Sequence, residues 1–103
     1  DYDSVVVAGV GHALPIIPDA TFTLDDQRYF LEIDRGTTRL EQWRKKALAY
    51  DAYTRDPRMR ERYGVSSALV LVVMPPGPRI HAIARTIAAV HNGTSDGYRF
   101  LNR

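Results

Sequence analysis

Residues 19–34 read DATFTLDDQRYFLEID, and this stretch decides the fold. Apolar and polar residues alternate on both sides of the Asp25-Asp26 pair, which is typical of two strands joined by a tight turn. A hairpin centred on that pair places Ala20 opposite Leu31, so the apolar sides of the two strands coincide. Since a slip of one residue would set these apolar side chains against charged ones, the pattern predicts a single register.

The same register gathers acidic side chains on one face of the hairpin. Asp19 is expected directly opposite Glu32, and Asp34 follows on the same face. Carboxylates that close repel each other by a few tenths to ~1 kcal/mol unless a cation lies between them. Mg²⁺ commonly takes one or two carboxylates plus water and substrate phosphate, so the pattern favours a divalent metal site. In the alternative, Asp19 merely starts a strand, and Glu32 and Asp34 form exposed ion pairs with Arg28 or Arg35.

Turn signals and periodicity predict the elements outside the hairpin. They are a strand over 4–8, a loop through Gly9, Gly11 and His12, a helix from about Thr38 to Thr54, a short helix from Pro57 that ends at Gly64, a strand over 68–74, a helix over 79–91 that Asn92-Gly93 closes, and a strand over 98–101. Thr38 followed by Glu41 is typical of a capping box. The continuous apolar run Ala68–Met74 is typical of a strand buried on both faces. This order predicts an α/β (α+β) fold with a mixed central sheet and flanking helices.

Composition narrows the class of protein. The 103 residues are 45% hydrophobic and 25% charged, as expected of one globular domain spanning 1–103. No apolar run approaches the ~18 residues that a membrane helix needs. Cysteine is absent, which excludes disulfides and thiolate metal sites and fits a cytoplasmic location. Because the chain starts at Asp1 rather than methionine, we expect it to be a fragment of a longer protein.

Basic residues are concentrated in the middle of the chain. Residues 35–62 hold nine of the 14 lysines and arginines but only four acids. Such a run is either a solvated helical face or a surface that faces phosphates. The second interpretation gains weight because the predicted acidic site immediately precedes the run.

Three short strings carry a resemblance to a known family. The strings PDA (18–20), FLEIDRGT (30–37) and KALAY (46–50) occur in an order and spacing that resemble the replication-relaxation family of plasmid and mobile-element proteins. That family includes relaxases for plasmid mobilisation that are similar to PD-(D/E)xK nucleases. The resemblance covers about Pro15 to Met74. It implies a restriction-endonuclease-like core, preceded in the full protein by a winged-helix DNA-binding region.

The resemblance also implies roles for individual residues. The implied metal ligands are Asp19, Glu32, the backbone carbonyl of Ile33 and, as an optional third acid, Asp34. Asp34 stands where the motif has a lysine, and Lys46 in the following helix is the candidate to replace that lysine. Lys46 would position water or stabilise the charge of the reacting phosphate; the alternative is a snorkelling lysine that covers Trp43. We expect the Lys46 ammonium within one water of either carboxylate.

The implied function is Mg²⁺- or Mn²⁺-dependent nicking of DNA in plasmid replication or mobilisation. Its implied DNA contacts are Arg35, Arg39, Lys45 and Tyr50, although Tyr50 also fits simple core packing. Because Asp34 departs from the motif, a catalytically inactive nuclease-like fold that binds DNA or a protein partner is the alternative. A third candidate is a protein-interaction or dimerisation module, which keeps a homo-oligomer open.

Overall fold

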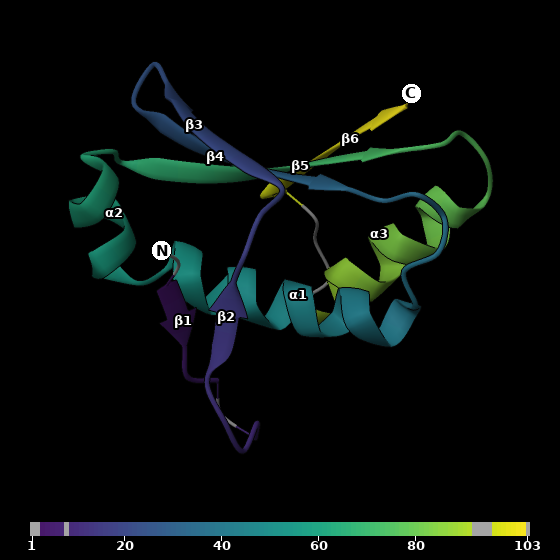
Figure 1. Ribbon diagram of the computed structural model, residues 1–103, viewed down its shortest axis with the longest axis horizontal. Coiled ribbons are helices and arrows are strands. Elements are labelled where there is room, and N and C mark those ends of the chain that lie inside the picture. The colour runs from purple at the N-terminus through teal and green to yellow at the C-terminus, as the bar shows by residue number, and fades with distance from the viewer. Residues whose placement is uncertain (1–2, 8, 92–95, 103) are drawn as a thin grey trace.

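A four-stranded mixed sheet forms the centre of the computed structural model, which describes residues 3–7, 9–91 and 96–102 (Figure 1). The elements are β1 (Asp3–Val5), β2 (Leu14–Ile16), β3 (Ala20–Leu24), β4 (Gln27–Ile33), α1 (Leu40–Thr54), α2 (Pro57–Tyr63), β5 (Ser67–Met74), α3 (Arg79–Val90) and β6 (Tyr98–Asn102). The main sheet has the order β3-β4-β5-β6. This confirms the predicted α+β class and mixed sheet, whereas the restriction-endonuclease-like core stays a prediction.

The β3–β4 hairpin has the predicted register, with Ala20 opposite Leu31. Asp25 and Asp26 form its turn with φ angles of 49° and 64°. Positive φ at both central residues is what a two-residue hairpin turn of the right twist requires, and aspartate tolerates it better than most residues. The local sequence therefore specifies this half of the sheet.

The hairpin turn also marks where β5 begins. The backbone N–H of Ser66 donates to the side chain of Asp26 at 3.1 Å and lies 3.4 Å from its carbonyl oxygen. From there β5 runs parallel to β4, starting with Gln27 beside Ser67. Asp26 thus fixes the register between two strands that are far apart in the chain.

The three helices of the described residues cover one face of the sheet. Helices α1 and α2 connect β4 to β5, α3 connects β5 to β6, and both strand pairs are parallel. Figure 1 shows these helices on the same side of the main sheet, with β1 and β2 lying against α1. Side chains from alternate strand positions, such as Phe30 and Val72, fill the space between sheet and helices. Glu32 and Asp34 lie on this covered side and are the buried charged residues among those that the structure describes.

The opposite face of the sheet carries no described helix or strand (Figure 1). The prediction that β5 is buried on both faces is therefore wrong for the part of the chain that the structure describes. Its even-numbered residues from Val70 to Met74 are buried, while Leu69, Leu71 and Val73 keep part of their surface exposed. A continuous apolar run therefore does not by itself show that both faces of a strand are covered.

The N-terminal segment departs from prediction. The strand expected over 4–8 spans Asp3–Val5, and Ala8 lies outside the described residues. It pairs antiparallel with β2, a strand that the sequence analysis missed, with Ser4 opposite Pro15. The two form a separate small sheet. A three-residue strand with proline at its centre gives little alternation to detect, and proline confines it to a sheet edge.

The helix ends follow the predicted signals in only one of two cases. Thr38 and Glu41 do not form a capping box, because α1 begins at Leu40 behind Arg39, which makes no side-chain cap. For α2 the signals hold, since the Asp56 side chain accepts the N–H of Arg58 and Gly64 ends the helix in the left-handed conformation. Asn92-Gly93, expected to close α3, lies outside the described residues.

No helix within 3–7, 9–91 and 96–102 is long and apolar enough to cross a membrane.

Candidate functional site

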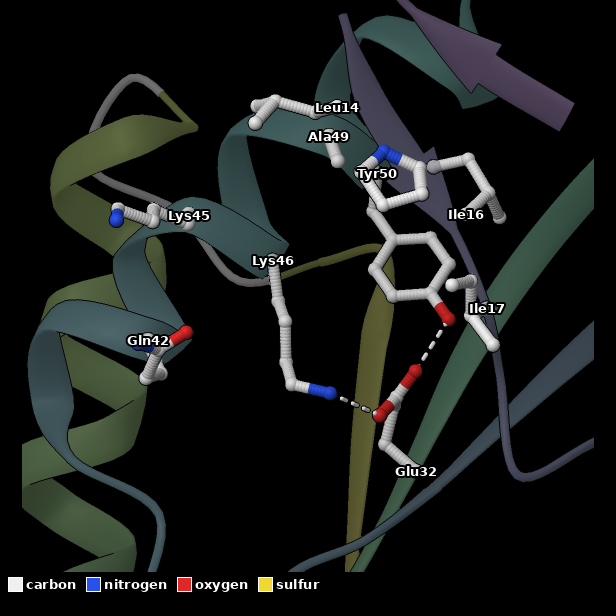
Figure 2. Close-up of a pocket in the computed structure, with 10 residues that line it drawn as sticks. Leu14, Ile16, Ile17, Glu32, Gln42, Lys45, Lys46, Ala49 and Tyr50 are labelled. Carbon is white, nitrogen blue, oxygen red and sulfur yellow. Dashed lines mark hydrogen bonds and ion pairs between the residues drawn. The ribbon is translucent and has the colours of Figure 1, made fainter.

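Glu32 on β4 is the centre of the candidate site. Its side chain is only 4% exposed and points from the sheet toward α1. Lys46 Nζ donates to Glu32 Oε1 at 2.8 Å, and the Tyr50 hydroxyl donates to Oε2 at 2.5 Å (Figure 2). The predicted approach of Lys46 to Glu32 is therefore confirmed. Both oxygens of this buried carboxylate have partners, as burial of a charge requires.

Lys46 covers Trp43, as the snorkelling interpretation expects, and also reaches Glu32, while its role at a phosphate stays a prediction. Its ammonium pairs with Glu32 and also lies 5.8 Å from the centroid of the Trp43 ring, within the range of a cation–π contact. The side chain is 38% exposed. A long side chain that reaches from solvent to a buried acid can change partner without disturbing the core.

Tyr50 belongs mainly to the core. Its ring packs against Phe30 with centroids 5.6 Å apart, and the residue is buried. Burial raises the pKa of the Tyr50 hydroxyl above its ordinary value, and the negative charges of Glu32 and Asp19 raise it further. The phenol therefore stays protonated and donates to Glu32. A contact between Tyr50 and DNA stays a prediction.

Asp19 lies at the end of the β3–β4 ladder. Regular pairing stops at Ala20 and Leu31, one residue short of the predicted Asp19–Glu32 pair. Asp19 Oδ2 instead accepts the backbone N–H of Ile33 at 2.7 Å, and its own N–H donates to the Leu31 carbonyl at 2.9 Å. The carboxylate thus replaces a strand carbonyl, while its charge still acts on Tyr50. It is a structural cap beside the candidate site.

Asp34 is held by an arginine that the sequence analysis did not connect to it. Arg79 Nε lies 2.8 Å from Asp34 Oδ2 and Arg79 Nη2 lies 3.1 Å from Oδ1, while Nη2 also donates to the carbonyl of Thr38. The Asp34 side chain has no exposed surface. The alternative of exposed pairs with Arg28 or Arg35 is therefore wrong.

The environment of Asp34 stabilises its charged form. Burial raises its pKa, but the hydrogen bonds and positive charge of Arg79 outweigh burial, and the net pKa is lowered. The indole N–H of Trp43 lies close enough to contribute, although it falls short of hydrogen-bond geometry. A carboxylate already neutralised by an arginine is a poor third ligand for a metal.

A hollow of about 240 Å³ opens beside Glu32. Figure 2 shows the side chains of α1 on one side and those around β2 on the other. The lining residues are Leu14, Pro15, Ile16, Ile17, Glu32, Gln42, Lys45, Lys46, Ala49 and Tyr50. The apolar wall comes from the strand that was missed, so sequence reasoning found the acid and the lysine but not the hollow between them.

The remaining predicted DNA contacts are exposed cations. Arg35 lies between β4 and α1, Arg39 precedes α1, and Lys45 lines the hollow. Their side chains can reach a phosphate backbone without desolvating a core. Contact with DNA stays a prediction for all three.

The donor set decides how a metal could be held. Among residues 3–7, 9–91 and 96–102, no group of three or more His, Cys, Asp or Glu side chains could hold an ion. The charges of Asp19 and Glu32 both act on the Tyr50 hydroxyl, and two carboxylates are the number that Mg²⁺ commonly takes with water and phosphate. Each carboxylate has about four lone-pair sites, and the contacts above use one on Asp19 and two on Glu32. The residues fit a magnesium ion bound largely through water and phosphate, not a fully protein-held one.

Comparison with known proteins gives one family. A family model described as replication-relaxation matches residues 6–69, from just after β1 into β5. The matched segment contains Asp19, Glu32, Lys46 and Tyr50. No curated protein and no solved structure matches the chain.

Proposed function

The chain belongs to the replication-relaxation family, and from this we propose that it cleaves one strand of plasmid or mobile-element DNA with the help of a divalent metal. One observation carries the proposal. A buried glutamate, Glu32, is held between Lys46 and Tyr50 at the wall of a hollow, with the carboxylate of Asp19 nearby. Acid and lysine side chains in one site, flanked by exposed arginines, are the groups that phosphodiester cleavage needs.

In the proposed reaction a water molecule attacks the phosphorus atom and gives up a proton to solvent, while the P–O bond to one sugar oxygen breaks and that oxygen takes up a proton from solvent. Mg²⁺ or Mn²⁺, when bound, would neutralise charge and orient the phosphate. Asp19 and Glu32, with the carbonyl of Ile33, would hold the ion. The exposed residues Arg35, Arg39 and Lys45 would hold the strand through its phosphates.

Lys46 is proposed to change partner during the reaction. It neutralises Glu32 in the free protein at 2.8 Å. When DNA arrives, its exposed ammonium can turn toward the reacting phosphate and stabilise the charge that develops there. This exchange would free one oxygen of Glu32, which is one of the residues that would hold the ion.

A second candidate function has its own supporting observation. Both oxygens of Glu32 are already occupied, and Asp34 is neutralised by Arg79. In a nuclease-like fold that has lost catalysis, the same contacts would serve only to satisfy a buried charge. Such a protein would still bind DNA or a protein partner in replication or regulation through its basic surface.

Metal-dependent stability separates the two candidates. A ligand that binds only the folded state at ~100 times its dissociation constant adds ~2.7 kcal/mol, a rise in melting temperature on the order of 10 °C for a domain of this size. We expect Mg²⁺ or Mn²⁺ to produce such a rise, and to support nicking of a supercoiled plasmid to its open-circular form.

Two variants and a control complete this experiment. Glu32→Gln should abolish both the metal shift and nicking, whereas Lys46→Met should keep the metal shift and lose nicking. Arg55→Met removes one positive charge from an exposed pair with Asp51 and serves as the matched control. Absence of any metal shift, together with unchanged DNA affinity in Glu32→Gln, would establish the non-catalytic candidate instead.

A further inference from the structure

The face of the main sheet that points away from the helices is almost entirely apolar. Alternation and register assign its residues, because positions on neighbouring strands that pair point to the same side. The apolar members are Ala20, Phe22, Leu24, Tyr29, Leu31, Ile33, Leu69, Leu71, Val73 and Leu101. Figure 1 shows no described element over this side of the sheet. We call these residues the bare face.

The bare face is unusual for strands of this kind. Parallel strands occur almost only in sheets that are covered on both sides, and β4, β5 and β6 are parallel. Large side chains here contact water, with Leu24 56% and Leu101 47% exposed. A contiguous apolar patch that spans four strands marks an interaction surface, whereas single exposed apolar residues do not.

Charge restricts what can cover the bare face. Among the outward-pointing positions of the four strands, Arg99 is the charged residue, and its guanidinium donates to the carbonyls of Asp96 and Tyr98 at 2.9 and 2.8 Å. The face therefore offers no cluster of cations to DNA and no acid to a basic partner. Its occupant must itself be apolar.

We propose that a second copy of this chain covers the bare face, so that two sheets pack against each other around a two-fold axis. A two-fold contact brings the same patch from both copies together. The bare face has no acidic residue, and its arginine, Arg99, bonds to backbone carbonyls of its own chain. Two copies of the face can therefore pack together without charge repulsion. Packed sheets of this kind align within about 30°. The other strongly exposed apolar side chains, Val6, Ile17 and Leu40, lie off this face and are scattered.

The size of the bare face indicates how tightly two copies can bind. Four strands spaced ~4.8 Å apart and five to eight residues long give a footprint of about 20 by 20 Å. Two copies together then bury roughly 800 Å², which is the size of a weak, transient interface. We therefore expect a weak dimer with a dissociation constant in the micromolar range. The helix side stays open in this dimer, so the proposal is independent of whether the Glu32 site cleaves DNA.

Sedimentation and light scattering test the dimer directly. The protein is measured from about 1 to 500 μM, a range that brackets a micromolar constant. We expect a shift from monomer to dimer, with a melting temperature that rises with concentration. A protein that is monomeric throughout, or that forms open-ended aggregates, overturns the proposal.

Variants locate the interface on the bare face. Leu71→Lys places a charge at its centre and should raise the dissociation constant about 100-fold or more, because the dimer would bury an unpaired ammonium. Leu101→Lys, at a side chain already 47% exposed, should act in the same direction while leaving the monomer fold intact. Leu40→Lys, on α1 and 41% exposed, is the matched control and should dimerise normally. If Leu101→Lys is folded by circular dichroism and dimerises like the control, the interface lies elsewhere and the proposal fails.

Discussion

Replacing Arg79 with methionine should destabilise the protein strongly, because it leaves the buried carboxylate of Asp34 without a counter-charge. Asp34 has no exposed surface and depends on Arg79 for two hydrogen bonds and for its counter-charge. Methionine keeps much of the volume of the arginine stem but cannot neutralise the acid. The side chain also leaves the carbonyl of Thr38 without its partner.

The size of the effect follows from burial. Removing one partner of a buried ion pair costs about 3–5 kcal/mol. Asp34 is sealed from solvent, but the Arg79 side chain is 29% exposed, so water screens part of the pair and the lower end applies. A loss of about 3 kcal/mol corresponds to a fall in melting temperature on the order of 10 °C.

The pH dependence identifies the cause. In the native protein the pKa of Asp34 is below its ordinary value of 3.8, so the pair contributes stability above that pH and loses it as pH falls through the folded pKa. Without Arg79, burial raises the pKa of Asp34. The penalty is then fully present at neutral pH and shrinks as pH falls toward the ordinary value, where the carboxyl can be protonated.

Urea unfolding at neutral pH and near pH 4 measures both quantities. The gap between wild type and Arg79→Met should narrow at the lower pH. Adding Asp34→Asn to Arg79→Met removes the stranded charge and should recover about half of the loss. An equal gap at both pH values, or a loss under about 1 kcal/mol at neutral pH, would refute the argument that the buried carboxylate is responsible.

Three further predictions concern other features. Asp19→Asn should change the free energy of unfolding by less than about 0.5 kcal/mol, since the amide oxygen can still accept the Ile33 N–H. Asp19→Ala should cost about 1–2 kcal/mol in the same urea assay. Equal stabilities of these two variants would show that the hydrogen bond to Ile33 is unimportant. Tyr50→Phe keeps the ring against Phe30 but removes the donor to Glu32, and should cost about 1.5–3 kcal/mol by thermal unfolding. Gly64→Ala should cost about 1 kcal/mol from its φ of 64° alone, because no atom lies within 4 Å of the added methyl group, while Gly11→Ala, equally uncrowded and outside the left-handed region, should be neutral.

The β3–β4 hairpin could be predicted because its signals are local. Alternation on both sides of Asp25-Asp26 leaves one register that matches apolar positions, and the turn residues tolerate the positive φ that this turn needs. The helix over 79–91 was located nearly as well, since it ends at Val90 in the structure. Each of these elements depends on contacts within a short segment of chain.

The candidate site was only half predictable because its other half depends on distant contacts. Lys46 could be expected near Glu32 because the family resemblance implies that the following helix supplies the lysine missing at Asp34. The partner of Asp34 could not, because Arg79 lies on the far side of two helices and a strand in sequence. The wall of the hollow comes from β2, whose three residues carry too little pattern to be recognised.

The contact between Asp26 and Ser66 has a consequence for the order in which the sheet assembles. A β-hairpin closes within about 1–10 μs, whereas β5 must first wait for the chain through α1 and α2 to return, at the cost of loop-closure entropy. When β5 arrives, the turn already presents both oxygens of Asp26 that the Ser66 N–H meets. The early hairpin therefore serves as a template for β5. The contact with Asp26 sets the position at which β5 begins to pair with β4, and the two strands then pair in one register.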